Sequence, residues 1–264
     1  MLLKRILTSA ALIGLITVTV SFDWLVGLAV TAFIVAGLYE FFTMLEKKGI
    51  IIYKYFGIAV GAVIPLSIML RFELTKGWEL LFVTLGLLFL IVMQFRRSQS
   101  SGVIVGISTT IFGIIYVSWF LSFLIKIRYL PRGMELLVAV LAITKLGDIG
   151  AYLVGSRFGK TPLMPRISPH KSIEGALGGL VFSVIAALLI KGVIKISYPQ
   201  SVLLGIFIGL LGQIGDLSES LMKRDCAVKD SGRLLPGMGG VLDVVDSLLF
   251  TAPVFYFLSS YAVI

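Results

Sequence analysis

Charged residues and glycines gather in one stretch near the C-terminus, between two strongly apolar segments. Residues 220–246 contain four cationic and four acidic side chains: Lys223, Arg224, Lys229, Arg233, Asp225, Asp230, Asp243 and Asp246. Paired carboxylates suit a hard cation such as Mg²⁺, and the cations with the backbone amides of the glycines suit phosphate groups. Charge at a bilayer boundary is costly to bury and is usually functional. The stretch therefore indicates metal-assisted phosphoryl chemistry at a membrane surface.

Three aspartates in this part of the chain are candidate metal ligands. Asp243 and Asp246 are three residues apart, so a helix places them on one face near its N-terminus, where the helix dipole favours carboxylates. Two such carboxylates repel each other unless a cation bridges them, which favours a divalent metal. Helix capping with solvation is the alternative. Asp216 precedes Ser220 and Lys223 on one helical face, and either a metal ion or Lys223 could neutralise it.

A second group of polar residues lies upstream. Lys145 and Asp148 fall within an apolar segment and are three apart, so they can form a structural ion pair. Ionisable groups inside a membrane are, however, candidates for function by default. The loop at 155–175 is rich in cations, prolines and hydroxyls, and it can hold phosphate oxygens by charge-assisted hydrogen bonds. An ordinary cytoplasmic loop would carry the same cations, and Ser168 or Ser172 could equally cap the next helix.

The composition indicates a membrane protein in which apolar helices must position these residues. The chain has 264 residues, of which 58% are hydrophobic and 14% are charged. Soluble domains carry about 45–50% apolar and about 25% charged residues, which excludes an ordinary soluble domain. Since a membrane-spanning helix needs about 20 mostly apolar residues, the apolar runs predict an all-α polytopic bundle of about nine transmembrane helices. The predicted spans are 6–21, 24–45, 51–70, 77–95, 102–125, 134–155, 173–190, 199–222 and 240–262.

The two halves of the chain differ in character. Residues 1–130 are apolar with charges at loop edges, and we expect a scaffold region that could also serve as lipid-facing surface or as the contact of a homodimer. Residues 131–264 hold nearly every polar group at membrane depth, and we expect them to form the catalytic region. Residues 1–21 resemble a signal peptide, but further spans follow without a clear cleavage site, which predicts a retained first helix.

The distribution of charge predicts location and partners. With the N-terminus inside, the inner loops hold about twice as many Lys and Arg residues as the outer loops, which places the N-terminus and both charged loops in the cytoplasm. The net charge of +9 suits anionic lipid headgroups and phosphorylated substrates rather than nucleic acid, because the cations lie in short loops between apolar runs. The single Cys226 excludes an intrachain disulfide.

The stretch from Ser220 to Asp246 strongly resembles the signature of phosphatidate cytidylyltransferases (CDP-diacylglycerol synthases). That signature reads S-x-x-K-R-x₄-K-D-x-[small]-x₂-[apolar]-P-x-H-G-G-x₂-D-R-x-D. Matching residues stand in register throughout: Ser220, Lys223, Arg224, Lys229, Asp230, Gly232, Leu235, Pro236, Gly239, Gly240, Asp243 and Asp246. Residues 147–152 and 168–175 also resemble a second block of the family. Met238 stands in place of the usual His, and Val244 in place of the usual Arg.

The resemblance implies an enzyme that combines CTP with phosphatidate to give CDP-diacylglycerol and pyrophosphate. It implies Mg²⁺ as cofactor, with Mn²⁺ as a substitute and room for a second cation, held by Asp216, Asp243 and Asp246. The other implied catalytic residues are Asp148, Lys171, Glu174, Lys223, Arg224, Lys229 and Asp230. The implied substrate-binding residues are Ser168, Ser220, Arg224, Lys229, Gly239 and Gly240. Since the nucleophile is an ionised phosphate oxygen that needs no general base, Met238 and Val244 are expected to be tolerated.

Two other functions fit parts of the sequence. A CTP-dependent polyprenol or lipid kinase would need similar nucleotide and metal groups, whereas the D-G-x₂-A-R-x₈-G-x₃-D-x₃-D pattern of CDP-alcohol phosphatidyltransferases is absent. An ion-coupled membrane transporter, a different class of protein, would use Lys145, Asp148 and Asp216 inside the bundle. That interpretation leaves the cationic, glycine-rich loops without a function.

Overall fold

The computed structural model describes residue 14 and residues 17–72, 78–95 and 101–260. The chain forms two compact units. The first contains the described residues up to Ile125 together with Cys226–Val244, and the second contains Lys126–Asp225 and the described residues from Val245 onward. The charged loop 226–244, assigned above to the C-terminal region, therefore belongs to the same unit as the N-terminal helices.

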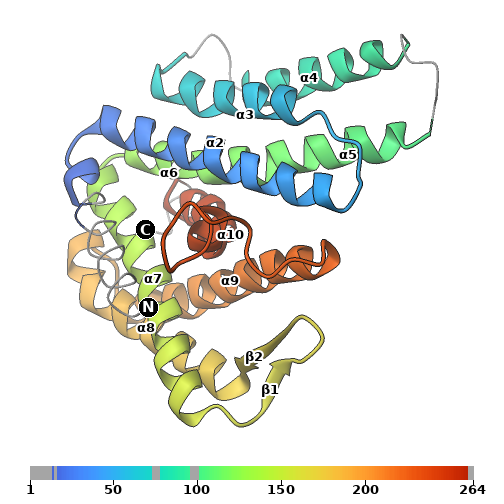
Figure 1. Cartoon of the computed structure of the whole chain (residues 1–264). Helices are drawn as coiled ribbons and strands as arrows, with labels where there is room; N and C mark the ends of the chain where they lie inside the picture. Colours follow the sequence, from blue (N-terminus) through green and yellow to red (C-terminus); the bar gives the residue numbers. More distant parts are fainter. Residues whose placement is uncertain (1–13, 15–16, 73–77, 96–100, 261–264) are drawn as a thin grey trace. The chain divides into compact units, whose positions relative to one another are not determined.

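Helices make up most of both units (Figure 1). The helices of the first half are α2 (Asp23–Lys47), α3 (Lys54–Met69), α4 (Trp78–Gln94), α5 (Val103–Gly113), the π-helix η1 (Ile114–Trp119) and α6 (Phe120–Arg128). Those of the second half are α7 (Gly133–Phe158), α8 (Ile173–Ile194), α9 (Tyr198–Asp225) and α10 (Leu242–Ser260). α10 begins in the first unit and continues in the second.

Six of the described helices are long and apolar enough to cross a membrane, which makes this the architecture of a multi-pass membrane protein. They are α2, the continuous helix Val103–Arg128 formed by α5, η1 and α6, and then α7, α8, α9 and α10. α3 and α4 are apolar but shorter. The predicted span at 6–21 lies mostly outside the described residues, and the count of nine stays a prediction.

The core of the first unit is built on α2. Leu38, Phe41 and Phe42 of this helix are almost completely buried. The neighbouring α3 approaches closely because it presents glycines: a Cβ on Gly61 would overlap Leu38, and one on Gly57 would overlap Phe42. Small residues allow helix backbones to approach in this way in membranes. The tight packing fixes α2, which carries a buried carboxylate described below.

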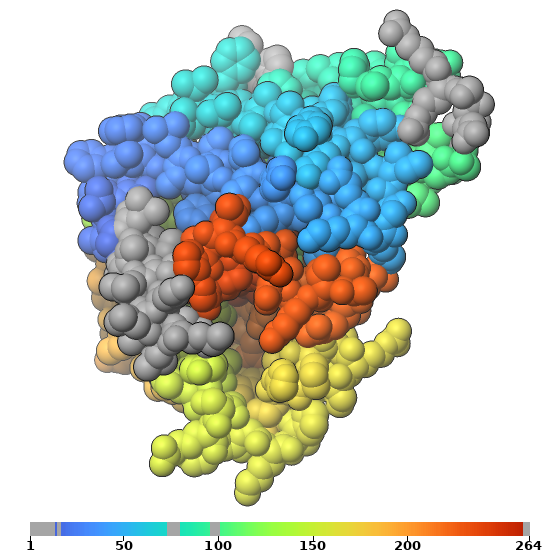
Figure 2. Space-filling view, in the orientation of Figure 1, coloured from blue at the N-terminus to red at the C-terminus, as the bar shows by residue number. Residues whose placement is uncertain are grey.

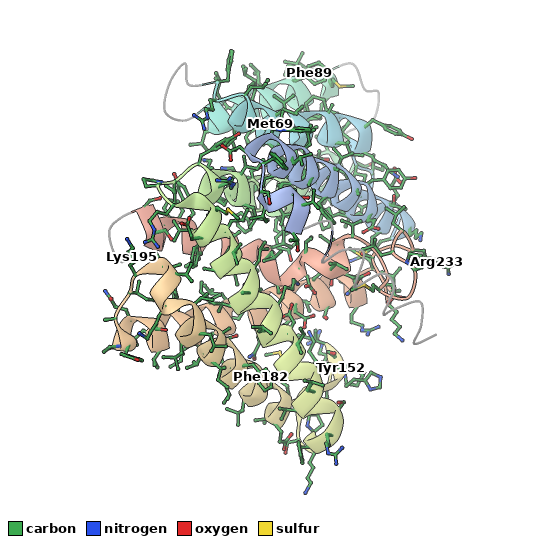
Figure 3. The ribbon with its side chains drawn as sticks, turned by 90° about the vertical axis from the view of Figure 1, so that its left-hand side faces the viewer. Met69, Phe89, Tyr152, Phe182, Lys195 and Arg233 are labelled. Carbon is green, nitrogen blue, oxygen red and sulfur yellow. The ribbon has the colours of Figure 1, made fainter. Side chains whose placement is uncertain are left out.

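The second unit is held together by close contacts of α8 with α7 and α9. A Cβ on Gly147 of α7 would overlap the side chain of Ser183 of α8, and one on Gly150 would overlap Phe182. Figure 3 shows where Phe182 lies along α8, next to α7. From α9, Gly205 packs directly on the backbone of Val184 of α8. These contacts determine the positions of the polar residues on α7 and α9.

A two-stranded antiparallel hairpin joins α7 to α8, where the sequence analysis expected only a loop in an all-α protein. Strands β1 (Pro162–Met164) and β2 (Ser168–Ser172) pair Pro162 with Ser172, and Figure 2 shows the hairpin, in yellow, protruding from this unit. The described chain is mostly helical, as expected of an all-α membrane protein, and this short hairpin is a local addition to that fold. The prolines and hydroxyl residues of this segment are typical of a loop. Proline is nevertheless compatible with a strand at its first residue or at the edge of a sheet, and both strands of a two-stranded hairpin are edge strands.

Candidate functional site

The C-terminal turns of α9 carry three predicted site residues, Asp216, Ser220 and Lys223. Lys171, near the end of β2, donates to Asp216 Oδ1 over 2.6 Å, and its Nζ lies 3.4 Å from Ser220 Oγ. The side chains of Lys171 and Asp216 are 26% and 40% exposed, so a ligand can reach this pair. The structure thus brings together Lys171, Asp216 and Ser220, which the sequence analysis placed in one site.

Lys223 forms an ion pair with Glu219, one turn earlier on α9. The Glu219 side chain is fully buried and the Lys223 side chain is 12% exposed. A buried charge is costly unless it is paired, so each residue stabilises the other. Sequence reasoning missed Glu219, although its spacing of four residues from Lys223 is typical of a helical ion pair.

Lys145 and Asp148 form the ion pair predicted from their spacing. Lys145 Nζ lies 2.9 Å from Asp148 Oδ2, and Ser247 of α10 completes a triangle. The Ser247 hydroxyl lies 2.8 Å from Lys145 Nζ and 2.8 Å from Asp148 Oδ2, so it can accept from the lysine and donate to the carboxylate. Ser247 is fully buried. It was missed because only the fold brings it to α7.

Asp246 lies at the centre of these groups. Its side chain is almost buried, its Oδ1 accepts from the amide of Ser247 at 2.6 Å, and Gly215 of α9 packs directly on its backbone carbonyl. Its carboxylate interacts electrostatically with four charged residues of the second unit: Asp216, Lys145, Glu219 and Asp148. With Lys171 and Lys223, the cluster holds four carboxyl groups and three lysines.

The acidic cluster has the donor chemistry that a hard divalent cation requires. The carboxyl groups of Asp216 and Asp246 lie on α9 and α10, close enough to repel each other when both are ionised. Among the residues that the structure describes, however, no three acidic, histidine or cysteine side chains form a group that could hold a metal by themselves. Mg²⁺ is commonly bound by one or two carboxylates, substrate phosphates and waters. Two carboxyl groups match that mode of binding in number and type, and a cation at this cluster stays a prediction.

Asp243 has a different environment, within the loop of the first unit. Its Oδ2 accepts from the amide of Ser231 at 3.0 Å, from the Ser231 hydroxyl at 2.9 Å and from the amide of Gly240 at 2.7 Å. These contacts connect the start of α10 to the preceding loop. The helix-end role, which the sequence analysis kept as an alternative, is thus present, and a metal role for Asp243 stays a prediction.

The glycines of the signature shape the loop from the inside. Leu235 and Gly239 exchange backbone hydrogen bonds at 2.9 and 3.2 Å, and Gly237 and Gly239 adopt positive φ angles of 82° and 95°. Glycine alone takes up this conformation without strain. Since the Gly239 amide donates to Leu235 and the Gly240 amide to Asp243, both amides are engaged within the loop. Their predicted contacts with substrate stay predictions.

The remaining predicted residues are distributed around the two units. In the second unit, Arg224 Nε donates to the carbonyl of Ile167 at 3.1 Å and so connects α9 to the hairpin. Glu174 accepts from the amides of Lys160 and Thr161 at 3.0 and 3.1 Å, which fixes the base of the hairpin rather than the acidic cluster. The other candidates are surface or partly exposed positions: Ser168, Lys229 and Asp230. Arg233 extends outward from the loop (Figure 3).

The expectation that the first half of the chain bears charge only at loop edges was wrong. Glu40, inside α2, is 3% exposed and accepts hydrogen bonds from Val241 and Leu242. The sequence signal was a single glutamate within the apolar run predicted as 24–45, and intramembrane carboxylates of this kind are candidates for function.

Comparison with known proteins places this geometry in context. A family model described as "Cytidylyltransferase family" matches residues 3–262. The phosphatidate cytidylyltransferase of Thermotoga maritima is 35% identical over 96% of this chain and 94% of its own length. The enzyme of the same name from Synechocystis is 34% identical over 89% of this chain and 88% of its own. An uncharacterized Escherichia coli protein, YnbB, is 38% identical over 69% of this chain and 63% of its own.

Proposed function

The chain belongs to the cytidylyltransferase family, and we propose that it transfers the cytidylyl group of CTP to phosphatidate, producing CDP-diacylglycerol and pyrophosphate. The observation that supports this most directly is the pairing of Lys145, Lys171 and Lys223 with carboxylates in the second unit, of which that of Glu219 is buried and those of Asp148 and Asp216 are partly exposed. Similarity to relatives named phosphatidate cytidylyltransferase supports the choice of substrates.

The reaction exchanges one phosphoanhydride bond for another. An ionised oxygen of the phosphatidate phosphate forms a bond to the α-phosphorus of CTP, and the bond from that phosphorus to the bridging oxygen of the β-phosphate breaks. Pyrophosphate carries away the electron pair, and no proton has to leave the nucleophile. Because two anions must meet, catalysis depends on charge neutralisation and alignment.

Lysines that are held by carboxylates are suited to neutralising and aligning the two anionic substrates. Asp216 and Glu219 hold the ammonium groups of Lys171 and Lys223 in place, and Lys171, whose side chain is 26% exposed, can donate to a substrate phosphate while it stays paired with Asp216. Lys145 is held by Asp148 and Ser247 and contributes a fixed positive charge to the same cluster. Preorganised charges of this kind need no rearrangement during the reaction.

We propose Asp216 and Asp246 as ligands of a divalent cation, with Asp243 as a predicted third. When bound, Mg²⁺ or Mn²⁺ would neutralise phosphate charge and stabilise the departing pyrophosphate. The carboxyl groups' own contribution is to provide oxygen ligands whose mutual repulsion a cation would relieve. We also propose that the N-terminus and the charged loops face the cytoplasm, where CTP is available, and that the N-terminal helices could support a homodimer.

Position-specific labelling of CTP tests the proposed reaction. Purified protein in phosphatidate-containing liposomes should move label from the α-phosphate of CTP into lipid, and label from the γ-phosphate into pyrophosphate. Omitting phosphatidate or chelating divalent cations should abolish the lipid signal. Transfer of γ-label into lipid would indicate a lipid kinase, and the absence of any CTP turnover by folded protein would contradict the proposal.

A further inference from the structure

Glu40 of α2 lies beneath the start of α10, within the first unit. Its Oε1 accepts from the amide of Val241 at 3.0 Å, and its Oε2 accepts from the amide of Leu242 at 2.9 Å. The Ser231 hydroxyl lies 3.1 Å from the same Oε2. The carboxylate of Glu40, in the N-terminal part of the sequence, is thus buried against the charged loop 226–244, in the C-terminal part.

These contacts satisfy groups that a helix cannot satisfy by itself. α10 begins at Leu242, so the amides of Val241 and Leu242 are among the first donors, which lack intrahelical acceptors. The helix dipole places partial positive charge at this end, and a carboxylate is favoured there. A glutamate that is 3% exposed needs such charge-assisted hydrogen bonds to offset its lost hydration. Glu40 therefore acts as the cap of α10.

The glycines of the loop make room for this carboxylate. A Cβ on Gly232 would overlap Glu40 Oε1, and a Cβ on Gly240 would overlap Glu40 Oε2 and Ser231 Oγ. Neither residue has a positive φ angle, so backbone conformation does not require glycine at these positions. Glycine is required there because the Glu40 carboxylate approaches the backbone closely. The contact with Glu40 of α2 therefore explains why positions 232 and 240 of the loop are glycines.

Ser231 connects Glu40 to Asp243. Its hydroxyl lies 3.1 Å from Glu40 Oε2 and 2.9 Å from Asp243 Oδ2. A hydroxyl has one hydrogen, so it can donate to only one carboxylate at a time. The position of either carboxylate therefore depends on the other, and a change at Glu40 is transmitted to Asp243 through one atom.

We propose that Glu40 is a positioning residue of the enzyme: it caps α10 in trans and sets the placement of Asp243 through Ser231. The inference rests on the proposed function only for its activity measurement. Residues that orient a site without touching substrate commonly change activity about tenfold to a hundredfold when removed. Glu40→Gln keeps the size of the side chain but replaces one acceptor oxygen by an NH₂ donor. This group must face one of the two backbone amides, so one of the two hydrogen bonds to Val241 and Leu242 is lost.

The test measures amide hydrogen exchange in the loop and turnover in the same full-length protein. Glu40→Gln should accelerate exchange at Val241 and Leu242, leave exchange in α8 unchanged, and lower kcat about tenfold or more with a smaller change in KM for CTP. Glu46→Gln, on the same helix, is the matched control. It removes a carboxylate that pairs with Lys54 at 3.0 Å and should leave loop exchange and turnover unchanged.

Gly232→Ala supplies a second, independent variant that retains Glu40. Its methyl group should displace the carboxylate, so that exchange at Val241 and Leu242 rises and kcat falls. In a Glu40→Ala background the same methyl group has space, and Gly232→Ala should have little further effect. Unchanged exchange in both Glu40→Gln and Gly232→Ala, or equal Gly232→Ala effects in both backgrounds, would overturn the inference. Because exchange does not require CTP turnover, an inactive parent protein would contradict the proposed function alone.

Discussion

Replacing Ser247 by alanine tests whether the polar cluster of the second unit is held as the structure describes. The Ser247 hydroxyl is fully buried and lies 2.8 Å from both Lys145 Nζ and Asp148 Oδ2. Alanine removes this oxygen and leaves the direct contact between Lys145 and Asp148, at 2.9 Å, in place. No other backbone or side-chain group has to move.

The magnitude follows from the two lost hydrogen bonds. A hydrogen bond to a charged group contributes about 1.5–3 kcal/mol to stability. The side chains of Lys145 and Asp148 are 36% and 38% exposed, so water replaces part of each lost contact. The remaining ion pair compensates part of this, so we expect Ser247→Ala to lower the free energy of unfolding by about 3 kcal/mol. Turnover should also fall, since Lys145 loses one of the groups that orient it.

Denaturant unfolding of the purified protein measures the loss, with Ser259→Ala as the control. Ser259 lies on the same helix, and its hydroxyl donates to the carbonyl of Phe255 at 2.8 Å. Its replacement should change stability by no more than about 0.5 kcal/mol. Equal stability of the two variants would refute the reasoning, because it would mean that Ser247 contributes nothing through Lys145 and Asp148.

Three further predictions concern single residues. Glu219→Gln removes the buried partner of Lys223 and should lower the free energy of unfolding in denaturant by about 3 kcal/mol; unchanged stability would show that the pair is not needed. Gly239→Ala places a Cβ beside Asp243 on a residue whose φ angle is 95°. It should reduce lipid labelling at least tenfold, which corresponds to roughly 1–3 kcal/mol of backbone strain; normal activity would contradict this prediction. Met238→Ala keeps the amide that donates to Leu235 and should retain activity within about tenfold, since no proton transfer is lost; a larger loss would reveal an additional role.

Local features of the site followed from the sequence. The pairing of Lys145 with Asp148 was predictable because a helix fixes the geometry of residues three apart. The shared face of Asp216, Ser220 and Lys223 followed from the same periodicity. The apolar runs predicted the helices from α2 to α10 closely, since only a sustained apolar stretch can span a membrane.

Contacts between distant segments did not follow from the sequence. The ion pair of Lys171 with Asp216 depends on a hairpin that brings β2 to α9, and proline-rich segments give no sign of strand pairing. Glu40 was missed because its partners are backbone amides about two hundred residues away, and any sequence can supply an amide. Such donors leave no pattern in the residue types.

Asp246→Asn is the decisive test of whether the carboxyl groups of the second unit support cytidylyl transfer with a divalent cation. The change preserves size and removes one charge, so lipid labelling from α-labelled CTP should fall about a hundredfold and recover in part at high Mg²⁺ or with Mn²⁺. Asp23→Asn, an exposed residue at the start of α2, should have no effect. Full activity of Asp246→Asn with an unchanged Mg²⁺ dependence would contradict the account.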